Sequence, residues 1–390
     1  MRVLITNMRL ARFSGTEVVV QHTADGLRRA GHEPVVYAPE LGEQAESMRV
    51  QGHRVVDRLS AVPFRPDVIH AQHVTPTLMA MAAFPDTPVV HVCHSAMFHI
   101  ERPILHPQIR RHVAVDQLCK ERCLAAGVDP ERLAVVYNPV DETRFARRGS
   151  LPAKPKRALL LTKTREQRKA VADACRVRGI ELVELGRAVG RFSNRIEDEL
   201  QGFDLVFATA RMAIEAAAVG CAVVVGDGRG VAGMLTPDRW PTWRHNNLGA
   251  ALLSQPVTAE AFGAAIDAYD AEQARAVGDA VRRDASLDGY IREMAAIYQS
   301  AIDDPALADP ARTAMATASL LEDWLPSPAE RTWRDVVSEM GWAARRNAEL
   351  REVEARLRTT TSEEARATRR SLKRAMQDLK AAMAKPGPKS

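Results

Sequence analysis

The chain alternates short apolar runs with segments of helical periodicity, and this alternation predicts its fold. Val3-Leu4-Ile5 reads as a buried strand, an amphipathic helix is expected from about Val18 to Arg29, and a second strand from Pro34 to Tyr37. Further strands are expected at residues 67–70 and 88–92 and around Ala114 and Val115. Because these runs of Val and Ile lack polar alternation, the strands should be covered on both faces, as in a doubly wound parallel sheet.

The same architecture repeats in the second part of the chain. Residues 149–156 have the Gly, Ser, Pro and Lys composition of a linker. After them, strands are expected at 158–161, 180–183, 205–208 and 222–225, with helices at 165–178 and 290–302. The pattern therefore predicts two Rossmann-like domains, residues 1–150 and residues 151–302, followed by a linker at 303–330 and a basic helical tail at 331–390.

Composition supports two domains and excludes several other classes. The chain has 390 residues, of which 46% are hydrophobic, and no apolar run approaches the 18 residues of a membrane span. We therefore expect a cytoplasmic protein. The five cysteines are odd in number and lack CxxC spacing, which argues against a disulfide framework and against a structural zinc site.

Positive charge is concentrated at the C-terminal end. Residues 331–390 hold 15 Lys or Arg against 8 Asp or Glu, a net charge of +7, while the whole chain carries +5. Such a tail is suited to an anionic glycan or to the inner face of a membrane, and a solvated oligomerising or capping helix explains it better. Aromatic residues are sparse there, so nucleic acid is not an expected partner.

The first candidate binding element is the loop after the first strand. Gly15 permits close backbone approach, and Thr16 is placed either to contact a substrate or simply to cap the next helix. The loop contains no GxGxxG, so a nicotinamide-binding fingerprint is not supported.

The second candidate is the segment 207–225, which reads as strand, turn, short helix of small side chains, Gly220 and strand. The N-terminus of such a helix offers N–H groups to a phosphate, and Arg211 at its start could reach a diphosphate. Glu215 is the charged residue on an otherwise apolar helix, so it needs either a partner or an exposed position.

Residues 215–224, EAAAVGCAVV, resemble the "EAxAxGxPVV" segment of the retaining, family-4 type of GT-B glycosyltransferases. The resemblance implies that Glu215 binds the ribose hydroxyls of a nucleotide-sugar donor. The first glutamate of the family pattern, eight positions earlier, corresponds to Phe207 here. The chain therefore departs from the family at the usual contact to the transferred sugar.

Other segments extend the resemblance over most of residues 1–302. Residues 66–70 are similar to the family's "PDVVH" strand, and residues 137–145 to its "NGVD…F" segment. The strand ending at His94 looks like the one whose histidine lies near the transferred sugar, although a histidine at a strand end is also commonly satisfied locally. Lys163 and Arg165 supply the charges of the diphosphate-binding "GR…KG" pattern without its glycines, and a solvated helix start explains them equally well. Residues 227–230, with Gly228 and Gly230, resemble the Gly-rich loop near the sugar.

Together these features predict a glycosyltransferase that moves a sugar from a nucleotide-diphosphate sugar to a hydroxyl of a glycan, lipid-linked or small-molecule acceptor. The family implies retention of configuration and no metal, because arginines and a helix N-terminus can neutralise the leaving diphosphate. The nucleotide sugar is a co-substrate, and no other cofactor is implied. Two alternatives stay open, a nucleotide-sugar 2-epimerase and a GT-B-like binding protein without catalysis.

Overall fold

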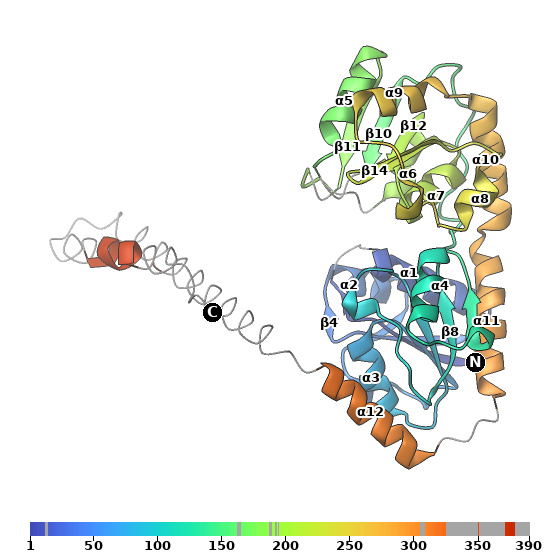
Figure 1. Cartoon of the computed structure of the whole chain (residues 1–390), viewed down its shortest axis with the longest axis vertical. Coiled ribbons are helices and arrows are strands. Elements are labelled where there is room, and N and C mark those ends of the chain that lie inside the picture. The colour runs from blue at the N-terminus through green and yellow to red at the C-terminus, as the bar shows by residue number, and fades with distance from the viewer. Residues whose placement is uncertain are drawn as a thin grey trace. The chain divides into compact units, whose positions relative to one another are not determined.

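The computed structural model describes residues 1–11, 15–161, 165–186, 189–191, 193, 195–304, 309–324, 350 and 371–378. The chain divides into two compact units, residues 1–316 and residues 317–390. The first unit contains two large β-sheets, which Figure 1 shows in blue to cyan and in green to yellow. These sheets are the centres of the two lobes described next.

The first lobe is built on a seven-stranded parallel sheet with the order β5-β3-β1-β6-β7-β8-β9. Its strands are β1 (Arg2–Thr6), β3 (Glu33–Tyr37), β5 (Arg54–Val56), β6 (Val68–Ala71), β7 (Val89–Cys93), β8 (Ile109–Ala114) and β9 (Leu133–Val135). Its helices are α1 (Gly15–Arg29), α2 (Glu43–Val50), α3 (Val74–Ala83) and α4 (Gln117–Ala125), and β2 (Arg9–Leu10) pairs with β4 (Glu40–Leu41). Every residue of β6 and β7 is buried, as expected for strands covered on both faces.

The second lobe repeats the design with a five-stranded sheet in the order β11-β10-β12-β13-β14. Its strands are β10 (Arg157–Leu161), β11 (Glu181–Leu185), β12 (Leu205–Ala208), β13 (Ala222–Asp227) and β14 (Gly230–Met234). Its helices are α5 (Arg168–Val177), α6 (Ile196–Glu199), α7 (Arg211–Val219), α8 (Trp240–Arg244), α9 (Ala259–Asp267) and α10 (Ala271–Asp284). All pairs are parallel except the hairpin of β13 and β14. The predicted doubly wound architecture of two Rossmann-like halves is confirmed.

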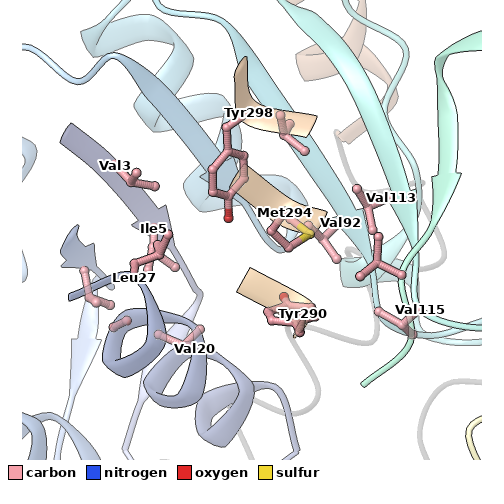
Figure 2. Close-up of a cluster of buried hydrophobic side chains, with 14 of the residues drawn as sticks. Val3, Ile5, Val20, Leu27, Val92, Val113, Val115, Tyr290, Met294 and Tyr298 are labelled. Atoms are coloured by element: carbon pink, nitrogen blue, oxygen red, sulfur yellow. The ribbon is translucent and has the colours of Figure 1, made fainter. Parts of the chain in front are cut away.

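Helix α11 (Leu287–Ile302) follows the second lobe in sequence but packs into the core of the first. Figure 2 shows Tyr290, Met294 and Tyr298 of this helix in one apolar cluster with Val3 and Ile5 of β1. Its assignment to a domain at 151–302 therefore needs correction. The apolar stripe predicts a helix with a buried face, but spacing alone does not say which core buries that face.

A hydrogen bond and a close helix contact fix α11 on the first lobe. The Tyr298 hydroxyl lies 2.6 Å from Nδ1 of His70 in β6, in a fully buried position. At Gly26 of α1, an added Cβ atom would lie only 2.4 Å from Cγ1 of Ile291, so the glycine allows the two helices to approach closely. This end of the predicted second domain thus belongs physically to the first.

The predicted linker at 303–330 contains helix α12 (Pro310–Trp324). Most of the predicted basic tail lies outside the described residues, and residues 371–378 within it are helical. Among the helices that the structure describes, none is both long and apolar enough to cross a membrane.

Candidate functional site

Helix α7 begins at the carboxyl end of β12, the edge of a parallel sheet where ligands usually bind. Ala210, at the N-cap position, has a φ of 54°, and no side chain caps the helix. The helix ends at Gly220, whose φ of +100° suits glycine. On α10, a Cβ atom added to Gly278 would lie 2.9 Å from the Ala217 carbonyl oxygen, so the small residues of α7 also serve close helix packing.

Glu215 and Arg211 form a buried ion pair one helical turn apart on α7. The Arg211 guanidinium contacts Oε1 of Glu215, and the two side chains are 18% and 2% exposed. Burial raises the pKa of Glu215, while the positive charges of Arg211 and Arg144 oppose that shift. The pair therefore supplies a carboxylate that can accept hydrogen bonds from hydroxyl groups, beside a guanidinium that can bind phosphate.

A polar cavity of about 380 Å³ is lined by residues of α1, α2 and α6 and by Asp141 and Arg144, and neither Arg211 nor Glu215 lines it. Two of its lining residues, Arg144 and Glu197, form an ion pair with an N–O distance of 3.0 Å and act electrostatically on the pKa of Glu215. The cavity also includes the pair of Arg29 and Asp141, 3.2 Å apart. The cavity is thus linked to the predicted ribose-binding carboxylate through the charges of Arg144 and Glu197.

Phe207, which takes the place of the family's first glutamate, is a core residue of β12. Its side chain is fully buried and packs edge to face on Phe262, with ring centroids 5.8 Å apart. Only Thr209 and Ala210 separate β12 from α7. The position is therefore occupied by the lobe's core and does not reach the edge of the sheet.

Residues 227–230 form the tight turn between β13 and β14. The Asp227 carboxylate bonds Arg229 at 2.6 Å and Oγ1 of Thr209 at 3.2 Å, and despite the opposing effect of burial these bonds lower its pKa. At Gly230, an added Cβ atom would lie 2.9 Å from the carbonyl oxygen of Leu253, so this glycine is required by packing. Gly228 is half-buried in the same turn.

The positions of the other residues predicted to bind the nucleotide-sugar donor give less evidence about a site. Lys163 lies outside the described residues, and Arg165 is exposed just ahead of α5. Gly15 and Thr16 open α1; Gly15 is exposed, and a Cβ atom added there would meet nothing within 4 Å. Packing therefore does not require a glycine at this position.

At the edge of the first sheet, His94 directly follows β7. It is half-buried, burial lowers its pKa to about 4, and its Nε2 atom has no hydrogen-bond partner among the described residues. The ring is thus neutral at physiological pH, and the tautomer decides whether its Nε2 atom donates or accepts a hydrogen bond. Its neighbour His73 has a φ of 64° and contacts the backbone N–H of Met8 and, at 3.2 Å, the carboxylate of Glu101.

Sequence reasoning missed three polar residues at this edge, Asn7, Gln72 and His73. Each lies just beyond the end of β1 or β6 and is buried, with exposures of 0%, 0% and 6%. The signal in the sequence was that each of them comes two or three residues after a predicted strand.

The fold of these two lobes is GT-B, and the chain resembles the GT-B glycosyltransferases. Residues 52–144 match the family model of Glycosyltransferase Family 4. This match lies in the first lobe and includes β6, which contains His70, and β7, which His94 follows, whereas the EAAAVG segment lies outside it. A search of curated proteins found no match.

Two solved structures illustrate the likeness in fold. HepE of Anabaena in complex with UDP and glucose is 14% identical, with a TM-score of 0.56 over 77% of this chain and 100% of that chain. The pneumococcal O-GlcNAc transferase GtfA in complex with UDP and GlcNAc is 8% identical, with a TM-score of 0.51 over 78% of this chain and 99% of that chain.

Proposed function

We propose that this protein is a nucleotide-sugar-dependent glycosyltransferase that binds its donor at the start of α7. The buried pair of Arg211 and Glu215 carries the proposal. Glu215 accepts hydrogen bonds from the ribose hydroxyls, and Arg211, with Lys163 and Arg165, neutralises the diphosphate. The uncapped first turn of α7 adds N–H groups for the same charge.

The charges of this site suit the chemistry of sugar transfer. The acceptor oxygen forms a bond to the anomeric carbon, the bond from that carbon to the diphosphate breaks, and the acceptor's proton is released. Because negative charge grows on the departing diphosphate, arginines placed beside it stabilise the transition state. We propose retention of configuration without a metal ion, with neutral His94 near the transferred sugar.

Uridine is the base to test first. HepE and GtfA, which share the fold, are both structures with UDP. Because their identity to this chain is low, these structures support only the choice of the first nucleotide to test. The transferred sugar is left open. UDP-glucose and UDP-GlcNAc are therefore the first donors to test, beside GDP-, ADP- and dTDP-sugars.

The test is a titration of the purified protein with each nucleotide sugar, followed by thermal shift and calorimetry, because a ligand of the native state raises its apparent stability. Glu215→Gln keeps the shape of the side chain and removes its charge. We expect this variant to bind UDP about tenfold or more weakly, the loss of a charged hydrogen bond. Product formation in excess EDTA tests independence from metal.

Asp204→Asn is the matched control. Asp204 is also a buried partner of an arginine, Arg148 at 3.2 Å. It precedes β12, however, and so lies at the amino end of this strand, whereas α7 follows the carboxyl end. Its substitution should leave UDP affinity unchanged. If no nucleotide sugar stabilises the wild-type protein at millimolar concentration, the proposal is wrong. Conversion of the sugar without any acceptor would identify an epimerase instead.

A further inference from the structure

The turn that follows α8 is bonded to the first lobe. It comprises residues 245–248, and we name it the bridging turn. The buried side chain of Asn247 donates a hydrogen bond from Nδ2 to the carbonyl oxygen of Val115, which directly follows β8. The N–H group of Gln117, at the start of α4, donates to the carbonyl oxygen of His245 at 3.0 Å. The bridging turn is therefore attached to the first lobe at two points.

The same turn holds the beginning of α7. The N–H group of Ala210, the N-cap residue of that helix, donates to the carbonyl oxygen of Leu248 at 2.8 Å. No described side chain caps α7, so this hydrogen bond fixes the N-cap from outside the helix. The bridging turn thus lies between the first lobe and the helix that carries Arg211 and Glu215.

The backbone of the bridging turn is strained at Leu248. Asn247 and Leu248 have φ angles of 47° and 52°. Asparagine tolerates this left-handed region, whereas leucine rarely adopts it. Strained residues persist where their surroundings over-determine them, and they gather at functional sites. Because Leu248 directly follows Asn247 and is fully buried, the bonds of the Asn247 side chain help to keep the Leu248 carbonyl in place.

The orientation of the Asn247 amide is set by its partners. Oδ1 accepts hydrogen bonds from the backbone N–H of Asn138 and from the Arg244 guanidinium, both at 3.1 Å. An NH₂ group in that place would face two donors, so Nδ2 is the atom that points to Val115. Arg244 is itself buried, and its guanidinium lies 5.2 Å from the centre of the Tyr137 ring. One side chain thus joins the first lobe, the segment after β9 and α8.

We propose that Asn247 is a positioning residue for the nucleotide-sugar site at the start of α7. Its amide holds the bridging turn against the first lobe, and the Leu248 carbonyl then fixes the N-cap. The first-turn N–H groups of α7 are thereby kept aimed at the diphosphate. The role in donor binding rests on the proposed function, whereas the link from Asn247 to the N-cap does not.

A simpler role for Asn247 is to end α8. The N–H groups of Asn247 and Leu248 donate to the carbonyl oxygens of Arg244 and Trp243, at 2.9 and 3.2 Å. This is the hydrogen-bond pattern of a Schellman C-cap, in which the left-handed residue is usually glycine and sometimes asparagine. In that role only the backbone conformation of Asn247 matters, and the bonds of its side chain do not.

Glycine at this position separates the two roles. Asn247→Gly keeps the left-handed backbone and removes the side-chain bonds. Asn246→Gly is the matched control, because it places the same residue in the same turn and the half-buried side chain of Asn246 bonds no described residue. Asn247→Asp is a second variant, which keeps the acceptor for Asn138 and Arg244 and loses the donor to Val115. Thermal melts establish that each variant folds.

Two measurements are made on each protein, well below its melting temperature. Hydrogen exchange of the ligand-free protein, resolved at residues 209–215, reports on the N-cap of α7. Calorimetry with UDP, GDP, ADP and dTDP reports on the donor site. For Asn247→Gly and Asn247→Asp we expect faster exchange at 209–215 and about tenfold weaker binding of the nucleotide that the wild type binds, the loss of one or two hydrogen bonds. Asn246→Gly should match the wild type in both measurements.

Several results would overturn the assignment. If Asn247→Gly matches the wild type in both measurements, Asn247 serves only to end α8. Faster exchange with unchanged nucleotide affinity would contradict the positioning role, and weaker binding with unchanged exchange would contradict the route through Leu248. If the wild type binds none of the four nucleotides, the proposed function fails and the donor role of Asn247 fails with it. The exchange measurement then still decides whether Asn247 holds the N-cap.

Discussion

The carboxyl edges of the two sheets are built from opposite chemistry. At the second sheet, Arg211 and Glu215 are charged and bonded to each other. At the first sheet, Asn7, Gln72 and His94 are neutral, and Oδ1 of Asn7, Oε1 of Gln72 and Nε2 of His94 have no hydrogen-bond partner among the described residues. A site that keeps its charges internally paired is stable while empty and can still bind an anionic ligand. One fold repeated twice thus presents different chemistry at its two carboxyl edges.

The lobes also differ in their buried histidines. Ten of the eleven histidines lie in residues 1–150, and the remaining one is His245. Burial lowers the pKa of His22, His70 and His91 to about 3, and that of His94 to about 4. These rings are neutral in the folded state but take up protons in the unfolded chain near pH 6.5. Acid should therefore act on the first lobe before the second.

The largest predicted effect is this acid sensitivity. Because the folded pKa values lie below the unfolded value, their contribution to stability is complete above about pH 6.5 and is lost as the pH falls towards 3 or 4. Several such groups together should reduce the stability of the first lobe by several kcal/mol. Peptide-resolved hydrogen exchange from pH 7 to pH 4 should show β1, β6 and β7 losing protection before β10, β12 and β13.

His91→Leu sharpens that experiment. Neither ring nitrogen of His91 has a partner among the described residues, so the substitution removes an acid-labile group without breaking a visible hydrogen bond. The pH at which β7 loses protection should fall in this variant. An unchanged midpoint, or simultaneous opening of both lobes in the wild type, would contradict the proposed difference.

The second effect concerns the internal pair of the second lobe. Arg211→Met leaves the Glu215 carboxylate buried without its partner, and such losses cost about 3–5 kcal/mol. The double variant Arg211→Met with Glu215→Met should recover most of that stability, since the unpaired charge is gone. Urea unfolding followed by the fluorescence of buried Trp240 would measure both. If the single and double variants are equally destabilised, the interaction between Arg211 and Glu215 contributes little to stability.

Much of this comparison was predictable from the sequence. Runs of Val and Ile predicted the buried strands, and the spacing of four between Arg211 and Glu215 is that of neighbours on one helix face. The edge strand β14 was missed because Gly230 reads as part of a loop. Helix α1 begins at Gly15, three residues before the expected Val18, because its first turn is polar.

What could not be predicted depends on the arrangement of elements in space. The partner of α11 is set by which apolar core lies within reach, and an apolar stripe does not encode that choice. The placement of Asn7, Gln72 and His94 at one edge depends on the strand order β1-β6-β7. Neither fact follows from local spacing. Asn7 and Gln72 read as ordinary loop residues until the sheet places them side by side.

The smallest predicted effect tests the attachment of α11 to the first lobe. Tyr298→Phe removes the 2.6 Å bond to His70 and leaves a buried ring nitrogen without its partner, which should cost about 1–3 kcal/mol. Tyr290→Phe, on the same helix and also buried, removes only a 3.4 Å contact with Thr23 and should cost less. Hydrogen exchange should show the loss in β6 and α11 and not in β12. A larger effect for Tyr290→Phe, or a loss centred on the second lobe, would mean that the helix is held by something other than this bond. If the expected order is found, the stability of α11 is set by the first lobe, although the chain reaches it through the second.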